Sequence, residues 1–234
     1  MTNSSALSNR ILASIPDSEY QRLSRQLELV KLRFGQVLYE PGKAIRYVYF
    51  PIDCLVSLLT SVDRHRTLEV GMVGNEGMAG MPFILGVGIS GVRGLVQGEG
   101  HALRMASKHF RTEFDRNPGL QQVLYRYTYA LMAQISQTAA CNRFHDAGER
   151  LARWLLMTRD RVGADEFSLT QGFLAHMLGL RRVGVTEAAG ELKRRKLITY
   201  TRGRLRILDV PGLKRASCSC YQIVNVVFAR AQRQ

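Results

Sequence analysis

Basic side chains near the C-terminal end are the residues of this sequence best suited to bind a ligand directly. The window from Arg181 to Arg206 contains nine arginine and lysine residues, is opposed only by Glu187 and Glu191, and has a net charge of +7. Arginine can form two parallel hydrogen bonds to guanine O6 and N7, and glutamate can accept one from the cytosine amino group. Arginine and lysine also bind phosphates. The window therefore predicts recognition of a polyanion, above all a nucleic acid.

The charge of the whole chain supports the same class of partner. The 234 residues include 33 Lys and Arg against 19 Asp and Glu, a formal net charge of +14, of which +10 lies in residues 143–234. Because 46% of the residues are hydrophobic, the chain is not a disordered polycation. No apolar run approaches the roughly 18 residues of a membrane span, and residues 1–5 lack the pattern of a secretory signal. We expect a cytoplasmic protein with no membrane partner.

Two short predicted helices position the first of these basic residues. Thr170 can cap the first helix, and Gly179 permits a tight turn before the second. The apolar residues spaced to face inward are Phe173, Leu174, Met177, Leu178, Val185, Ala188, Ala189 and Leu192. This pattern is typical of a helix-turn-helix, whose second helix can present its N-terminal residues in the major groove of DNA.

A predicted β-hairpin follows the second helix. Residues 197–200 and 205–208 read as two short strands around a turn that contains Arg202, Gly203 and Arg204. The hairpin completes a winged helix-turn-helix, which can also serve as a protein-interaction module, but the charge of +7 favours DNA. The predicted base-reading residues are Arg181, Arg182, Val183, Thr186 and Glu187. The predicted phosphate contacts are Thr170, Lys193, Arg194, Arg202 and Arg204.

The first half of the chain predicts an antiparallel β-roll. Short β-rich runs lie at 37–39, 47–50, 54–59 and 68–73, and turn residues separate them. Ten of the 21 glycines fall between Gly71 and Gly100, a density typical of bulges and tight corners in a small barrel or roll. One or two short helices are expected within residues 9–29, and a start at Pro16 is favoured. No phosphate-binding P-loop pattern is present.

One long helix is predicted between the roll and the winged helix. Asn117 can cap it and Pro118 suits its first position. An apolar stripe with three- and four-residue spacing follows, consisting of Leu120, Leu124, Tyr127, Leu131, Ile135 and Thr138. This stripe either packs on its own domain or forms a seam between two copies of the chain, and periodicity alone leaves both open.

The chain resembles the Crp/Fnr superfamily of bacterial transcription regulators. The resemblance rests on the order of roll, long helix and winged helix, and on the stretches at 37–42, 70–78 and 137–143, which look like a branch with no defined effector. It implies an α+β fold divided into a cyclic-nucleotide-binding-like roll (1–117), a dimerisation helix and hinge (118–144) and a DNA-binding domain (145–234). It also implies double-stranded DNA as partner, a homodimer joined through the stripe of the long helix, and RNA polymerase as a candidate further partner.

The expected sensor site departs from the family pattern. Members that bind cyclic nucleotide use a Gly-Glu-Leu segment for the ribose and an Arg-Ser pair for the phosphate. Here residues 76–83 place no carboxylate at the ribose position, and the arginine downstream is not followed by serine. No cofactor is therefore predicted, and cyclic nucleotide is not expected. The resemblance leaves Gly77, Met78, Ala79, Gly80 and Arg93 as the candidate effector pocket.

No metal site is predicted from the cysteines and histidines. The residues considered are Cys54, Cys141, Cys218, Cys220, His65, His101 and His109. The cysteines are too dispersed for the N-terminal cluster of the iron–sulfur members, and the histidines are isolated. Cys218 and Cys220 are expected to be small residues packed in a terminal helix, with a redox pair or half of a metal site as the alternative.

The sequence thus predicts a sequence-specific DNA-binding transcription regulator that acts as a homodimer on a palindromic site. Its two recognition helices are expected about one helical turn apart on the duplex. The alternative is a ligand-independent DNA-binding or architectural protein with a degenerate sensor domain. An enzyme is not predicted, because His65, His101, Glu69 and Glu76 in the roll have no recognisable ligand spacing.

Overall fold

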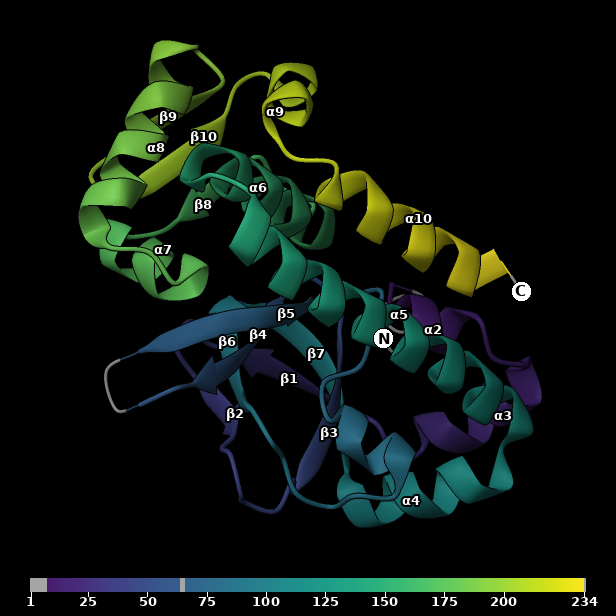
Figure 1. Ribbon diagram of the computed structural model, residues 1–234. Helices are drawn as coiled ribbons and strands as arrows, with labels where there is room; N and C mark the ends of the chain where they lie inside the picture. The colour runs from purple at the N-terminus through teal and green to yellow at the C-terminus, as the bar shows by residue number, and fades with distance from the viewer. Residues whose placement is uncertain (1–7, 64–65, 234) are drawn as a thin grey trace.

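The computed structural model describes residues 8–63 and 66–233, so the first residues of the predicted roll domain and His65 lie outside the described part. The chain forms a β-roll with flanking helices, a long helix across the roll, and a mixed C-terminal head (Figure 1). The predicted α+β architecture is confirmed. No helix in the described ranges is long and apolar enough to cross a membrane.

Two antiparallel sheets build the roll. Its strands are β1 (Glu28–Leu32), β2 (Val37–Tyr39), β3 (Tyr47–Pro51), β4 (Leu55–Ser61), β5 (Thr67–Val73), β6 (Arg93–Gly98) and β7 (Gly100–Ala106). One sheet has the order β1-β7-β3 and the other β2-β6-β4-β5. Strand β4 lies between β6 and β5, and its residues 55–59 are all buried, which explains why four of the five are apolar.

Strand β6 shows why part of the roll was not among the predicted β-rich runs. Its sequence is interrupted by Gly94 and Gly98, which weaken a strand pattern. A Cβ atom at Gly94 would lie 2.5 Å from the Tyr39 ring, so only glycine lets β2 and β6 approach so closely at this point. The glycine density that predicted a roll thus reflects close backbone approaches.

The helices of the N-terminal half surround the roll. They are α2 (Arg10–Ala13), α3 (Asp17–Ser24), the short 3-10 helix η1 (Met81–Leu85), α4 (Ser107–Arg116) and the long α5 (Pro118–Phe144). Asn117 occupies the N-cap position of α5, as predicted, but its side chain makes no capping bond. The carboxylate of Glu19 accepts instead from the backbone N–H groups of Gly119 and Leu120, at 3.2 and 3.1 Å. A carboxylate at this end also complements the helix dipole.

The residues predicted for the dimer seam lie on the inner side of α5. The six residues predicted for it face the interior of their own chain, packed against the roll and the C-terminal helix: Leu120, Leu124, Tyr127, Leu131, Ile135 and Thr138. Ile135 is partly buried and the other five are buried, so little of this stripe is exposed. A different side of α5 is exposed, where Tyr125, Tyr129 and Met132 are 53%, 64% and 57% accessible. Both sides have helical spacing, and only the packing shows which one the fold covers.

The C-terminal head begins directly after α5. Its elements are α6 (Ala147–Val162), β8 (Glu166–Ser168), α7 (Gln171–Leu178), α8 (Arg182–Arg194), β9 (Ile198–Thr201), β10 (Arg204–Ile207), α9 (Val210–Ala216) and α10 (Cys220–Arg233). The predicted hairpin is β9–β10, and β8 joins it to give the sheet order β8-β10-β9. The last helix, α10, returns to lie along α5 (Figure 1).

Candidate DNA-binding interface

Local capping fixes the two helices of the predicted helix-turn-helix. The Thr170 hydroxyl accepts from the Phe173 backbone N–H at 3.1 Å, as predicted for the start of α7. Gly179 ends α7 with φ of +59°, a conformation that favours glycine. A Cβ at Gly179 would lie 2.7 Å from the Leu68 side chain, so the turn also packs closely on the roll. In α8, Val185 and the inward residues that follow it are buried as predicted.

The predicted base-reading residues form the outer surface at the start of α8. Arg181, Arg182, Val183, Thr186 and Glu187 are all exposed, and Val183 is 61% accessible. The Thr186 hydroxyl lies 2.9 Å from the Arg182 carbonyl oxygen and 3.1 Å from the side-chain oxygen of Gln171 in α7. This contact links the first turns of the two helices. The structure thus brings the five residues together on one free helical face, the geometry that reading base edges requires.

A shallow cleft brings part of the predicted phosphate set together. It is lined by Thr170, Gln171, Arg182, Tyr200, Arg202 and Gly203. The wing is fixed beside it because the Tyr200 hydroxyl donates to the Leu169 carbonyl oxygen at 2.9 Å. Arg202 and Gly203 at the wing tip have φ of +50° and +79°, as a two-residue hairpin turn with both central residues at positive φ requires. Arg182, predicted to read a base, therefore shares a cleft with Thr170 and Arg202, predicted to bind phosphate.

Two of the predicted phosphate contacts are already in ion pairs. Arg194 pairs with Glu191 along α8, and Arg204 pairs with Glu166 of β8 at 3.5 Å. Both arginine side chains are more than three-quarters exposed. Exposed pairs of this kind contribute little stability, so either arginine can exchange its carboxylate for a phosphate at low cost.

The candidate effector segment is closed in this structure. Residues 77–80 are buried, and a Cβ at Gly77 would lie 2.5 Å from the Tyr127 ring. Arg93 instead lies at the surface, where its Nε donates to the Glu40 carboxylate at 2.8 Å. Tyrosine and valine side chains fill the space in front of the glycines, so the five predicted residues do not form an open pocket. Sequence pattern could not show this, because Tyr127 reaches Gly77 from another element.

A buried polar cluster joins the roll to the head. The carboxyl of Glu69, on β5, accepts from Nε1 of Trp154, on α6, at 2.9 Å, and lies 2.5 Å from the Ser57 hydroxyl. The Ser57 hydroxyl also lies within hydrogen-bond distance of the Gln97 side-chain oxygen, and the Gln97 amide donates to Thr158 of α6 at 3.5 Å. Burial raises the pKa of Glu69 to about 7, although the hydrogen bonds to Ser57 and Trp154 act to lower it.

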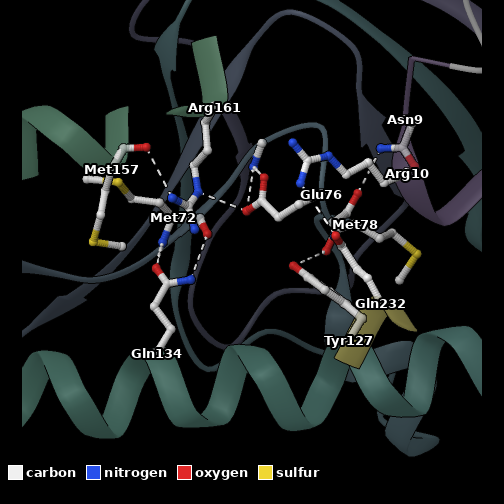
Figure 2. Close-up of polar contacts among 12 residues, drawn as sticks. Asn9, Arg10, Met72, Glu76, Met78, Tyr127, Gln134, Met157, Arg161 and Gln232 are labelled. Carbon is white, nitrogen blue, oxygen red and sulfur yellow. Dashed lines mark hydrogen bonds and ion pairs between the residues drawn. The ribbon is translucent and has the colours of Figure 1, made fainter. Parts of the chain in front are cut away.

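A second set of contacts, shown in Figure 2, also joins the roll to α5 and α6. Arg161 of α6 donates from Nε to Glu76 at 2.8 Å, and both side chains are buried. Gln134 of α5 donates to the carbonyl oxygen of Met72 and accepts from its N–H, at 3.2 and 2.8 Å. Sequence reasoning considered Glu69 and Glu76 only as metal ligands. Their role as anchors depends on partners about 85 residues away, a separation that no local pattern reveals.

The fold thus joins a β-roll through a long helix to a basic winged helix-turn-helix whose second helix is exposed at its start. Residues 149–216 match the family of Crp-like helix-turn-helix domains. This part of the chain is therefore a Crp-like helix-turn-helix domain, as the resemblance implied for it. Comparison with curated protein sequences finds no match.

Several solved structures have a fold similar to this one over most of the chain. FixK2 from Bradyrhizobium japonicum is 13% identical, with a TM-score of 0.69 over 82% of this chain and 98% of its own. A CRP/FNR-family transcriptional regulator from Thermus thermophilus is 21% identical, with a TM-score of 0.63 over 81% and 98%. The c-di-GMP-responsive global regulator CLP from Xanthomonas campestris is 15% identical, with a TM-score of 0.63 over 83% and 100%. At these identities the likeness shows the fold.

Proposed function

We propose that this protein is a sequence-specific DNA-binding transcription regulator that acts as a homodimer on a palindromic site. The observation that carries the proposal is the exposed N-terminal face of α8, which presents Arg181, Arg182, Val183, Thr186 and Glu187 beside a basic wing. A helix with free polar side chains at its start fits the major groove, and the wing can reach the neighbouring backbone. The partner is double-stranded DNA, and RNA polymerase is a second proposed partner.

The roles within this interface follow from position. Residues on the first turns of α8 read base edges, while Thr170, Lys193, Arg194, Arg202 and Arg204 bind phosphates. Because Arg182 lines the cleft with Thr170 and Arg202, its guanidinium stands at the border between base and phosphate contacts. No catalytic role and no cofactor is proposed for these residues.

The dimer interface that we propose is the exposed side of α5, in place of the buried stripe. The exposed residues there recur at alternating spacings of four and three: Tyr125, Tyr129, Met132, Ser136, Ala139 and Arg143. This is the heptad spacing of a two-stranded coiled-coil seam. Pairing of two copies along this seam would leave both recognition helices free for successive major grooves.

We retain the proposed division into a roll (1–117), a helix with hinge (118–144) and a DNA-binding domain (145–234). The contacts of Trp154 with Glu69 and of Arg161 with Glu76 connect the outer two units directly. A change in the roll can therefore reach the head without passing through α5 alone. The proposed working compartment is that of the DNA, the bacterial cytoplasm.

The second candidate function is a DNA-binding protein that needs no effector. The closed packing at residues 77–80, where the Tyr127 ring covers Gly77, favours it. Under this alternative the roll is a structural support for α5, and DNA affinity is constant. Titration of operator DNA with and without small-molecule extracts separates the two candidates, because a regulator with an effector changes its affinity and a constitutive binder does not.

Selection of bound sequences from a random DNA library tests the proposed function. The wild-type protein is expected to enrich one palindromic motif over competitor DNA at physiological salt. Arg182→Ala is expected to lose preference at one or two base pairs of each half-site, a cost of roughly 1–3 kcal/mol. Lys108→Ala, on α4 of the roll, is the control and should leave the motif unchanged. Enrichment of no motif by the wild-type protein would refute sequence-specific regulation.

A further inference from the structure

Three cysteines and a histidine from distant parts of the sequence meet where α5 ends. Cys141 and His145 are one helical turn apart at the end of α5, Cys218 lies between α9 and α10, and Cys220 begins α10. One ligand atom from each of these four residues lies within 4.8 Å of all the others. The Sγ atoms of Cys141 and Cys218 are 3.5 Å apart, and Sγ of Cys220 is 3.5 Å from Nδ1 of His145. All three cysteines are free thiols and buried.

The two separations of 3.5 Å match the edges of a tetrahedral metal site, and the other pairs of ligand atoms lie within 4.8 Å. Zinc binds cysteine sulfur at about 2.3 Å and histidine nitrogen at about 2.0–2.1 Å, so its tetrahedral ligand atoms lie about 3.5–3.8 Å apart. Thiolate and imidazole are soft or borderline donors, which favour zinc over magnesium or calcium. A cluster of several irons holds its cysteine ligands farther apart, because the ligands sit on the outside of the cluster. The short distances between the ligand atoms therefore favour a single tetrahedral ion over a cluster of several irons.

The charges around the four residues also fit such an ion. Arg150 and Arg153 are only 9% and 7% exposed, and the Nε atom of each lacks a hydrogen-bond partner. Neither takes part in an ion pair among residues 8–63 and 66–233. Both interact electrostatically with Cys141. Zinc with three thiolates and one imidazole carries a net charge of −1, which would compensate one of the two buried positive charges.

A hydrogen bond to one of the sulfur atoms also supports a metal site. The side-chain amide of Gln137, one turn before Cys141, donates to Sγ of Cys220 at 3.1 Å. Hydrogen bonds to ligand atoms from a surrounding shell are a regular feature of metal sites, where they orient the ligands. The cluster is thus closed by four protein ligands and supported by neighbours, as structural zinc sites are.

We propose that Cys141, His145, Cys218 and Cys220 bind one zinc ion in a closed tetrahedral site. The sequence predicted no metal, because Cys141 and Cys218 are 77 residues apart and the ligands have no recognisable spacing. The ion fixes the α9–α10 connection to the end of α5, next to Asp146, where the head begins. Zinc would therefore hold α10 on α5 and set the direction in which the DNA-binding head leaves the long helix.

Cobalt titration of the full-length protein under reducing conditions tests the site. We expect one cobalt ion per chain, a near-ultraviolet thiolate-to-cobalt charge-transfer band, and the strong visible absorption of tetrahedral coordination. Zinc added afterwards should displace cobalt and abolish both signals. Elemental analysis of protein purified without chelator should find zinc in the same ratio.

Single substitutions assign the ligands. Cys218→Ser and Cys220→Ser should each weaken metal binding by at least roughly 100-fold, since the loss of supporting residues alone costs 10–100-fold. Cys54→Ser is the matched control, because Cys54 is also a buried free thiol but belongs to the roll. If the serine variants fail to fold, His145→Gln keeps the test, because this half-buried residue can be replaced at small cost and should shift the cobalt spectrum.

Three outcomes would overturn the proposal. The first is that the reduced wild-type protein binds neither zinc nor cobalt. The second is that the ligand variants bind the metal as tightly as Cys54→Ser does, with an unchanged cobalt spectrum. The third is that the purified protein contains a disulfide between Cys141 and Cys218 and no metal, which would make the cluster a redox pair. None of these outcomes bears on whether the protein selects a DNA motif, so the zinc site and the proposed function can fail separately.

Discussion

Replacing Glu69 with glutamine keeps the shape of a side chain at the junction of roll and head but removes its charge. The carboxyl is only 6% exposed, and burial raises its pKa to about 7. Ser57 has one hydroxyl proton but lies beside two acceptors, Glu69 and the Gln97 carbonyl oxygen. A protonated Glu69 can donate to Ser57, which then donates to Gln97. The glutamine side chain can reproduce this arrangement at every pH, with its amide as the donor.

The sign of the expected effect follows from the two pKa values. When the pKa of an acid is higher in the folded chain than in the unfolded chain, its protonated form contributes fully to the stability of the fold at low pH. That contribution is lost as pH rises through the folded pKa. For Glu69 the window runs from its ordinary value of 4.5 to about 7. The interval corresponds to roughly 3 kcal/mol at pH values above the window. Glu69→Gln escapes this cost, so the variant should be the more stable protein at neutral and higher pH.

Thermal and urea unfolding at several pH values measures the difference. The variant and the wild type should be about equally stable near pH 4.5, and the variant should gain up to roughly 3 kcal/mol near pH 8. In a chain of this size that gain is roughly 6–12 °C in Tm. Glu99→Gln, at the exposed turn between β6 and β7, should show no such trend. A difference between variant and wild type that does not change with pH would refute the protonated Glu69.

Three further predictions concern the interface, the dimer and the junction. Arg202→Ala with Arg204→Ala should weaken binding to all DNA sequences and reduce the slope of log K against log salt by about 2, measured by fluorescence anisotropy; an unchanged slope would exclude phosphate contacts at the wing. Tyr129→Glu should raise the dimer dissociation constant roughly 30-fold, the equivalent of about 2 kcal/mol at a central interface residue, whereas Gln26→Glu, at an exposed position outside α5, should not, as sedimentation equilibrium can show. Arg161→Leu should cost about 3–5 kcal/mol in urea unfolding, because it leaves Glu76 buried without its partner, and adding Glu76→Gln should recover part of the loss.

The winged helix-turn-helix could be predicted because its signals are local. Thr170 caps α7 by accepting from the backbone N–H three residues further on, Gly179 takes the positive φ of the turn, and the inward residues of α8 follow one another at helical spacing. Propensity, capping and periodicity act over a single turn of helix or hairpin, so a short stretch of sequence contains them completely. The same holds for the net charge of +7 between Arg181 and Arg206.

The roll could be predicted as a class but not in its details. Glycine density indicated close backbone approaches, and the structure shows what approaches: the Tyr39 ring at Gly94 and the Tyr127 ring at Gly77. These rings come from other elements, so the sequence around the glycines could not show that the candidate effector segment is filled. Family resemblance supplied the position of a pocket, whereas side-chain packing decides whether space remains there.

The order of roll, long helix and winged helix, the helix-turn-helix with its wing, and the place of the positive charge could all be predicted from the residues alone. Only the tertiary structure decided which side of α5 is covered, because Leu124 and Tyr129 lie on two sides with equally helical spacing and the docking of β5 and α10 chooses between them. It also decided that Glu69 is buried under Trp154 and that Cys141 meets Cys218. These are contacts between residues far apart in the chain. Their energies depend on the packed positions of whole elements, which the spacing of residues along one element does not specify.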